Sequence, residues 1–282
     1  MKPVRLKTKI FLDSGDPKET REALRLLGFL DGQTTNPSLI SKNPEAAGKK
    51  FTKEELLGFY KAVVQEISEL VPQGSVSIEV YADKDTRAEE MLEQGREMFS
   101  WIPNAHIKFP TTKEGLKAAQ QAIRERIRVN MTLVFSQQQA AAVYAATKGA
   151  KRGDVFVSPF IGRLDDRGEN GMSLIANIIR MYKDGDGHVE VLTASVRNLQ
   201  HLLHAIHLNS DIITASAKIL KEWAEKGLPL PQSDFVYDSK GLKNIPSKEI
   251  DLKKDWQKFV ISHELTDIGI ERFSADWNKL YV

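Results

Sequence analysis

One lysine lies inside an apolar segment where a charged side chain is unexpected. In residues 104–110, Ile107 and Phe109 alternate with Lys108, the pattern of a β-strand, and Pro110 ends the strand because it has no amide donor. If the apolar pair packs under helices, Lys108 points into the enclosed side of the sheet. Only a neutral amine attacks a carbonyl carbon, and burial favours the neutral form. We therefore predict that Lys108 is a nucleophile; the alternative is a solvated lysine at a strand end.

Polar side chains also follow the other apolar segments of the chain. They are two carboxylates, two amides, several hydroxyls and an arginine: Asp13, Thr34, Asn36, Glu79, Asn130, Thr132, Ser158, Ser195 and Arg197. An amine that adds to a carbonyl needs a carboxylate to move protons during addition, dehydration and carbon–carbon cleavage. Amides and hydroxyls can hold a polyol. The set predicts imine chemistry on a sugar-like ketone.

Three members of this set have a structural alternative. Asp13 could cap a helix, but Asp16 is better placed to do so, and we predict that Asp13 is the acid/base. Glu79 could form a structural ion pair with Lys108 or position a catalytic water. Asn36 could be only the cap of a short helix, or it could bind substrate.

Two arginines predict a phosphate site. Ser195 and Arg197 are predicted to open a helix, where free amide donors and the positive end of the dipole favour an anion. Arg163 lies on a neighbouring predicted loop, residues 160–166. Its alternative partner is Asp165 or Asp166, in a surface ion pair of the kind that contributes little to stability.

Eight alternations of a short strand with an amphipathic helix must position these residues. The predicted strands are residues 9–13, 30–35, 76–80, 104–110, 127–133, 154–158, 189–194 and 211–214. Eight such units favour an α/β fold with a closed parallel sheet, the (β/α)8 TIM barrel. An open, doubly wound sheet is less compatible with the polar residues near the strand ends. In a barrel, those ends share one mouth.

The repeat stops before the end of the chain. We assign residues 1–230 to a barrel catalytic domain and residues 231–282 to a carboxyl-terminal extension. Within the extension, apolar residues recur at helical spacing, namely Ile270, Phe273, Trp277 and Leu280. This amphipathic helix is expected to pack on its own barrel or on a neighbouring subunit of a homo-oligomer.

Composition excludes several classes of protein. The 282 residues include 40 Lys and Arg against 38 Asp and Glu, a net charge of +2, so no strong field recruits nucleic acid or membrane. Cysteine is absent, which removes disulfides and thiolate metal ligands. No apolar run approaches the ~20 residues of a membrane span, and no phosphate loop or dinucleotide motif follows a strand. We expect a soluble cytoplasmic protein without metal or cofactor.

Seven segments, in order along the chain, resemble the transaldolase family. They are residues 11–13 (FLD), 31–38 (DGQTTNPS), 76–80 (VSIEV), 107–110 (IKFP), 130–136 (NMTLVFS), 157–163 (VSPFIGR) and 194–198 (ASVRN). Phe109 departs from the family pattern, in which an aliphatic residue is usual. Residues 232–248 match nothing in that pattern.

The resemblance implies a metal-free class I aldol mechanism. Lys108 would form the Schiff base, Asp13 would be the general acid/base, and Glu79 with Thr132 would order a catalytic water. The residues expected around the dihydroxyacetone unit are Thr34, Asn36, Asn130 and Ser158, and those expected at the phosphate are Arg163, Ser195 and Arg197. Phe160 is also expected to contact the substrate. The unit would pass between sugar phosphates, from sedoheptulose 7-phosphate to glyceraldehyde 3-phosphate, in the pentose phosphate pathway.

Two positions separate this chain from a sister branch. The branch resembling fructose-6-phosphate aldolase carries glutamine and tyrosine where this chain has Glu79 and Phe160, so the resemblance favours the transferase. An aldolase that releases free dihydroxyacetone is the first alternative. A barrel that binds sugar phosphates without catalysis is the second.

Overall fold

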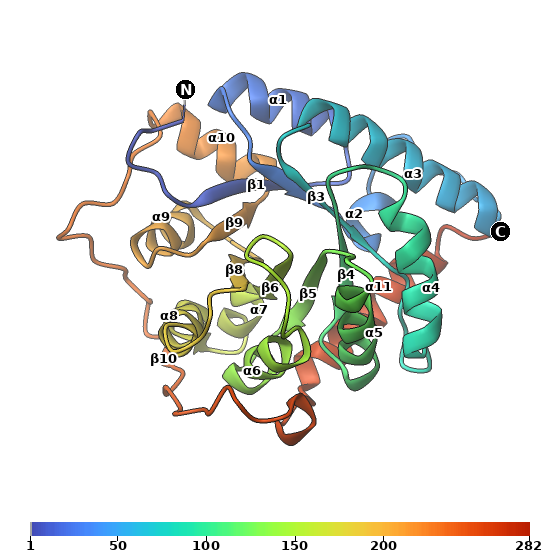
Figure 1. The fold of residues 1–282 in the computed structure, drawn as a ribbon. Coiled ribbons are helices and arrows are strands. Elements are labelled where there is room, and N and C mark those ends of the chain that lie inside the picture. The colour runs from blue at the N-terminus through green and yellow to red at the C-terminus, as the bar shows by residue number, and fades with distance from the viewer. Residues whose placement is uncertain (1) are drawn as a thin grey trace.

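The protein is described by a computed structural model for residues 2–282, and its centre is a closed barrel of parallel strands (Figure 1). The strands are β1 (Lys9–Asp13), β2 (Gly32–Thr34), β3 (Ser75–Glu79), β4 (Ala105–Pro110), β5 (Val129–Val134), β6 (Val155–Pro159), β8 (Val189–Thr193) and β9 (Ile212–Ala215). They pair in that order, and β9 closes the barrel on β1. All eight predicted strands are present, which confirms the TIM-barrel prediction.

Helices surround the barrel (Figure 1). They are α1 (Pro17–Leu27), α2 (Pro37–Ser41), α3 (Lys53–Leu70), α4 (Ala88–Phe99), α5 (Lys113–Arg124), α6 (Gln137–Ala146), α7 (Ile161–Asp165), α8 (Gly171–Tyr182), α9 (Leu199–His207), α10 (Ala217–Glu225) and α11 (Glu264–Asn278). A two-stranded sheet joins β7 (Glu169–Asn170) to β10 (Lys243–Asn244). None of the helices within residues 2–282 has the length and apolar composition that crossing a membrane requires.

Strand β4 has the predicted orientation. A Cβ atom added at Gly95 of α4 would lie 3.0 Å from the ring of Phe109 and 3.2 Å from the side chain of Ile107, so both apolar residues pack outward under that helix. Lys108 and His106 therefore face the interior of the barrel, because side chains alternate along a strand.

The segment 160–166 was predicted as a loop, and this is wrong: Ile161–Asp165 forms α7. Its start is fixed by the end of β8, because the amides of Ile161 and Gly162 donate to the carbonyls of Ala194 and Ser195, each at 3.1 Å. This long-range pairing is not visible in the local sequence.

The prediction that Ser195 and Arg197 open a helix is also wrong. Helix α9 begins at Leu199, and Asn198 caps it by accepting a hydrogen bond from the amide of His201 at 2.9 Å. Ser195 has a φ of 58°, a left-handed conformation that a right-handed helix cannot include. Ser195 and Arg197 therefore lie on the connection between β8 and α9.

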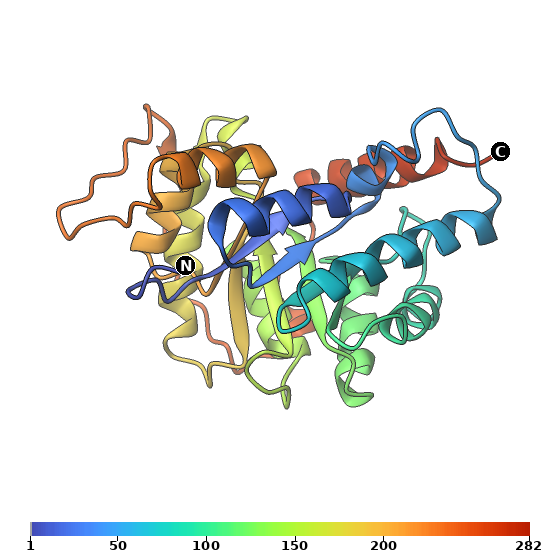
Figure 2. The same ribbon diagram turned by 90° about the horizontal axis from the view of Figure 1, so that it is seen from above.

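The carboxyl-terminal extension runs around the outside of the barrel (Figures 1 and 2). Residues after α10 pass beside α9, α8 and α6, and Figure 2 shows α11 beside α2 at the far end of this path. Thr266 of α11 donates to the carbonyl of Leu133 on β5 at 2.9 Å. The four apolar residues named above, Ile270, Phe273, Trp277 and Leu280, are buried within the chain.

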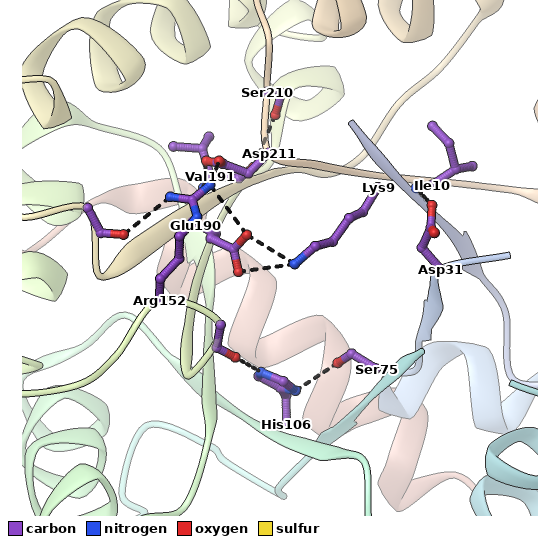
Figure 3. Close-up of polar contacts among 12 residues, drawn as sticks. Lys9, Ile10, Asp31, Ser75, His106, Arg152, Glu190, Val191, Ser210 and Asp211 are labelled. Carbon is purple, nitrogen blue, oxygen red and sulfur yellow. Dashed lines mark hydrogen bonds and ion pairs between the residues drawn. The ribbon is translucent and has the colours of Figure 1, made fainter. Parts of the chain in front are cut away.

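Polar side chains gather at the opposite, amino-terminal end of the barrel, and Glu190 and His106 among them are buried (Figure 3). Glu190 is buried on β8, and both of its carboxylate oxygens accept from Lys9 Nζ, at 3.1 and 3.3 Å. Arg152 lies 3.6 Å from the same carboxylate and also pairs with Asp211. Lys9 and Arg152 therefore compensate the buried charge of Glu190.

His106 is the inward residue of β4 at this end (Figure 3). Its Nε2 lies 2.8 Å from the carbonyl oxygen of Gly153, and its Nδ1 lies 2.7 Å from Ser75 Oγ. A carbonyl only accepts, so Nε2 carries the proton and the Ser75 hydroxyl donates to Nδ1. The ring stacks on Phe156 with centroids 4.0 Å apart. Burial lowers the pKa of His106 to about 3.

We expect His106 to make the fold sensitive to acid. Its pKa of about 3 in the folded protein lies below that of the unfolded chain, so between these values only the unfolded chain binds the proton. Through this one group, the free energy of unfolding should fall by about 1.4 kcal/mol for each pH unit below ~6.5. Urea unfolding at pH 7, 5.5 and 4.5 measures it.

The matched comparison is His106→Gln, which keeps an amide donor but does not titrate. This variant should be less stable at pH 7 and should lose less stability on acidification. An identical pH dependence in the two proteins would contradict a buried, neutral His106.

Candidate active site

A cavity of about 410 Å³ opens at the carboxyl ends of the strands. Nine of the twelve predicted site residues line it: Asp13, Thr34, Asn36, Lys108, Ser158, Phe160, Arg163, Ser195 and Arg197. The remaining three, Glu79, Asn130 and Thr132, are buried on neighbouring strands. The fold thus gathers residues that are up to 184 positions apart, from 13 to 197, at one mouth.

Lys108 and Glu79 form an ion pair inside the barrel. Their side chains are 3% and 5% exposed, and Lys108 Nζ lies 2.7 Å from Glu79 Oε2. The register of β3 and β4 places the two residues opposite each other. Lys108 Nζ also donates to the carbonyl of Thr35 at 3.0 Å. Burial raises the pKa of Glu79, although the positive charge of Lys108 opposes this shift, so Glu79 is a stronger base than an exposed glutamate.

Asp13 lies at the end of β1 and lines the cavity beside Thr34. Thr34 Oγ1 donates to Asp13 Oδ1 at 2.6 Å, and the hydroxyl of Thr214 lies 2.6 Å from Thr34 Oγ1. Since Thr34 uses its proton on Asp13, Thr214 must donate to Thr34. Burial raises the pKa of Asp13 against the opposing effects of the Thr34 hydrogen bond and the charge of Lys108. Asp16 caps α1, as predicted.

A chain of hydrogen bonds fixes the amide of Asn130. Its Nδ2 donates to Ser77 Oγ at 3.0 Å, and its Oδ1 accepts from Ser158 Oγ at 2.6 Å. Ser77 was not among the predicted site residues. Its position two residues before Glu79, on the same face of β3, is the signal that could have identified it.

Asn36 and Thr132 are two further predicted site residues, and their environments differ. Asn36 caps α2, because its Oδ1 accepts from the amide of Leu39 at 2.9 Å, and it also lines the cavity. The helix cap and a place in the cavity, given above as alternatives for Asn36, are therefore compatible. Thr132 is fully buried on β5, and its hydroxyl has no hydrogen-bond partner among residues 2–282.

Arg163 projects from α7 between two aromatic rings. Its guanidinium carbon lies 5.8 Å from the centroid of Phe160 and 5.7 Å from that of Phe273 on α11. Burial lowers the pKa of Arg163, and the charges of Arg272 and Arg197 lower it further. The positive charges of Arg272 and Arg197 are therefore close enough to repel that of Arg163.

The alternative in which Arg163 pairs with Asp165 or Asp166 is wrong. Asp166 instead pairs with Arg197 at 2.8 Å, and Asp165 lies 3.0 Å from Nε2 of His201. Arg163 has no ion-pair partner within the described chain, residues 2–282.

Several cavity residues were not predicted. They are hydroxyl and cationic residues on α2, β9, α10 and α11, with one aromatic: Ser38, Lys42, Thr214, Ser216, Lys218, Arg272 and Phe273. Most follow a strand by several residues or come from the extension, so strand-end position gives no signal for them. Thr214 is the exception, because it lies within a predicted strand.

The arrangement suits addition of an amine to a ketone. A buried amine on β4 reaches the cavity surface, with one carboxylate on the adjacent strand β3 and a second carboxylate on β1 at the same mouth of the barrel. Both carboxylates have a raised pKa, which is suited to proton transfer near neutral pH. Arginines at the far rim provide charge for an anion.

Comparison with known proteins gives the family. A family profile described as "Transaldolase/Fructose-6-phosphate aldolase" matches residues 10–282. A protein of Dehalococcoides mccartyi named "Probable transaldolase" is 35% identical over 272 residues, covering 96% of this chain and 99% of the relative. Relatives of the same name from Herpetosiphon aurantiacus and Brucella ovis are 36% and 37% identical, covering 96% of this chain and 96% and 97% of their own. The chain belongs to the transaldolase/fructose-6-phosphate aldolase family.

Proposed function

We propose that this protein is a transaldolase that transfers a dihydroxyacetone unit through a Schiff base on Lys108. The observation that carries the proposal is Lys108 itself, buried at 3% exposure yet lining the cavity, with Glu79 at 2.7 Å. A lysine with only a structural role needs no access to a cavity. The names of its relatives support the same reaction class.

The Lys108 amine adds to the ketone carbon of sedoheptulose 7-phosphate and loses water, forming an imine. Asp13 takes the proton of the C4 hydroxyl as the C3–C4 bond breaks, and erythrose 4-phosphate leaves. The three-carbon enamine stays on the lysine. It attacks the aldehyde of glyceraldehyde 3-phosphate, and hydrolysis then releases fructose 6-phosphate. The raised pKa of Asp13 fits a group that takes and returns a proton.

Formation of the imine by dehydration and its later hydrolysis need a water molecule held in position beside the lysine. Thr132 has a buried hydroxyl without a hydrogen-bond partner among residues 2–282, and Glu79 offers a buried carboxylate beside Lys108. We assign this pair to holding that water. Glu79 then has two roles, as counterion of the lysine and as base toward the water.

The remaining polar residues hold the substrate. Asn36 and Thr34 on one side and Asn130 with Ser158 on the other are assigned to the hydroxyls of the dihydroxyacetone unit. The phosphate is assigned to the rim, where the residues are Arg163, Ser195 and Arg197. The reaction belongs to the non-oxidative pentose phosphate pathway and would take place in the cytoplasm.

Borohydride trapping tests the covalent step. Reduction in the presence of fructose 6-phosphate should leave one three-carbon adduct, and peptide mapping should place it on Lys108. Lys42 lines the same cavity but is exposed, so it is an internal control that should stay unlabelled. Lys108→Met, checked for folding by circular dichroism, should form no adduct and show no turnover. A folded Lys108→Met protein with normal turnover would remove the proposal and favour a binding barrel.

Asp13→Asn tests the proton transfer. The amide keeps the acceptor for Thr34 but cannot take a proton, so kcat should fall by about 10²- to 10⁴-fold with little change in phosphate binding. Asp16→Asn is the matched control, since asparagine caps a helix as well as aspartate does. Equal kcat values for the two variants would show that Asp13 is not the acid/base.

A double variant tests the choice between transferase and aldolase. Glu79→Gln with Phe160→Tyr removes the carboxylate beside Lys108 and adds a hydroxyl beside Arg163. We expect the ratio of free dihydroxyacetone to transferred product to rise, because the variant then carries the residues of the aldolase branch. The ratio is measured by coupled assay with and without acceptor aldehyde. An unchanged ratio would contradict our interpretation of these two positions.

A further inference from the structure

The rim of the cavity carries more positive charge than the assigned phosphate residues provide. The cationic side chains in its lining are Lys42, Lys108, Arg163, Arg197, Lys218 and Arg272, whereas among residues 2–282 Asp13 is the one carboxylate in that lining. Lys108 is balanced by Glu79, and Arg197 pairs with Asp166 outside the lining. Lys42, Lys218, Arg163 and Arg272 form no ion pair among residues 2–282, and Arg163 and Arg272 are the planar guanidinium donors in this group.

Arg272 comes from α11, the helix of the carboxyl-terminal extension, and not from the barrel. The nearest acidic residue one turn along this helix is Asp276. That carboxylate is already engaged by the hydroxyl of Ser38 and by Lys279 at 3.1 Å. The bond to Ser38 attaches α11 to α2. Against the opposing effect of burial, the pKa of Asp276 is lowered by the hydrogen bonds from Ser38 and Lys279 and by the charges of Lys279 and Arg272. Arg272 forms no ion pair with this carboxylate within the described chain, and its side chain lines the cavity.

Two glycines allow a helix backbone to lie close against an arginine of the cavity. A Cβ atom at Gly269 of α11 would lie 2.6 Å from Leu133 and 3.3 Å from Nη1 of Arg163, so α11 reaches this depth only because the residue is glycine. A Cβ atom at Gly162 of α7 would lie 2.2 Å from Nε of Arg197. Close backbone approach therefore brings α11 against Arg163 and α7 against Arg197, and Arg272 lines the same cavity from α11.

Like charges held this close repel unless an anion lies between them. The charge of Arg272 lowers the pKa of Arg163, which is the effect of repulsion between the two cations. A phosphate ester carries up to two negative charges and three acceptor oxygens, which match planar guanidinium groups with several donors each. A neutral sugar would leave the repulsion in place.

We propose that Arg272 completes the phosphate site, so that the carboxyl-terminal helix α11 binds substrate directly. The inference rests on the proposed function and adds a residue of the carboxyl-terminal extension to its phosphate site. It also gives α11 a role in binding as well as in packing. Phe273, the next residue, lies under the Arg163 guanidinium and holds it toward the same place.

Arg272→Gln is the test, because the side chain is exposed and its loss leaves no buried group unpaired. The KM for fructose 6-phosphate should rise about tenfold, the effect of removing one hydrogen-bonded charge, with kcat unchanged. The inhibition constant of inorganic phosphate should rise by a similar factor. Arg272→Lys should recover part of the affinity, since it keeps the charge but not the planar fork.

Lys279→Gln is the matched control, because Lys279 is an exposed cation that directly follows α11 and does not line the cavity. It should leave KM and phosphate inhibition unchanged. Equal effects of Arg272→Gln and Lys279→Gln would indicate general electrostatics and overturn the assignment, as would an unchanged KM in Arg272→Gln.

Binding without turnover separates this inference from the proposed reaction. Inorganic phosphate should raise the melting temperature of the wild type more than that of Arg272→Gln, and borohydride trapping of free dihydroxyacetone should be equal in both. If trapping fails in both proteins while the phosphate effect still depends on Arg272, the proposed reaction is wrong and the phosphate site stands. A phosphate effect of equal size in both proteins overturns the site, whatever trapping shows.

Discussion

The ion pair between Lys108 and Glu79 is the interaction on which the rest of the site depends. Two buried charges are tolerated only when they lie close together and their remaining donors and acceptors are satisfied. The parallel register of β3 and β4 sets the two residues opposite each other, and the carbonyl of Thr35 takes a further hydrogen bond from the amine at 3.0 Å. A shift of one residue in either strand would turn one charge into the layer of helices.

Strand β4 carries one inward residue that is packed and hydrogen-bonded, at its amino end, and one that reaches the cavity, at its carboxyl end. His106 and Lys108 both face the interior, since they are two residues apart. At the amino end, His106 is neutral, stacked on Phe156 and hydrogen-bonded on both nitrogens. At the carboxyl end, Lys108 keeps its charge partner and gains access to the cavity. The first position is closed by packing, whereas the second is left open to a ligand.

Much of this could be predicted because strands and their ends leave a local signal. Alternation in residues 104–110 indicates which side of β4 is enclosed, and the end of each strand marks the mouth of a barrel. The errors fall where long-range contacts decide the conformation. The hydrogen bonds of Ile161 and Gly162 to the end of β8 fix the start of α7. The left-handed conformation of Ser195 means that α9 begins only after this residue. Arg272 gave no signal because only the folded chain brings α11 to the cavity.

The position of α11 links the extension to the barrel mouth through short-range contacts. Thr266 binds the carbonyl of Leu133, and Asp276 binds Ser38 beside the cavity. Gly269 lets the helix lie close to Leu133 and Arg163. These contacts set the depth of the helix, and that depth places Phe273 against Arg163. A barrel alone would leave this arginine on an open rim, where water would weaken its attraction for an anion. The extension therefore acts on the site by excluding water from one side of the guanidinium and by adding a second positive charge there.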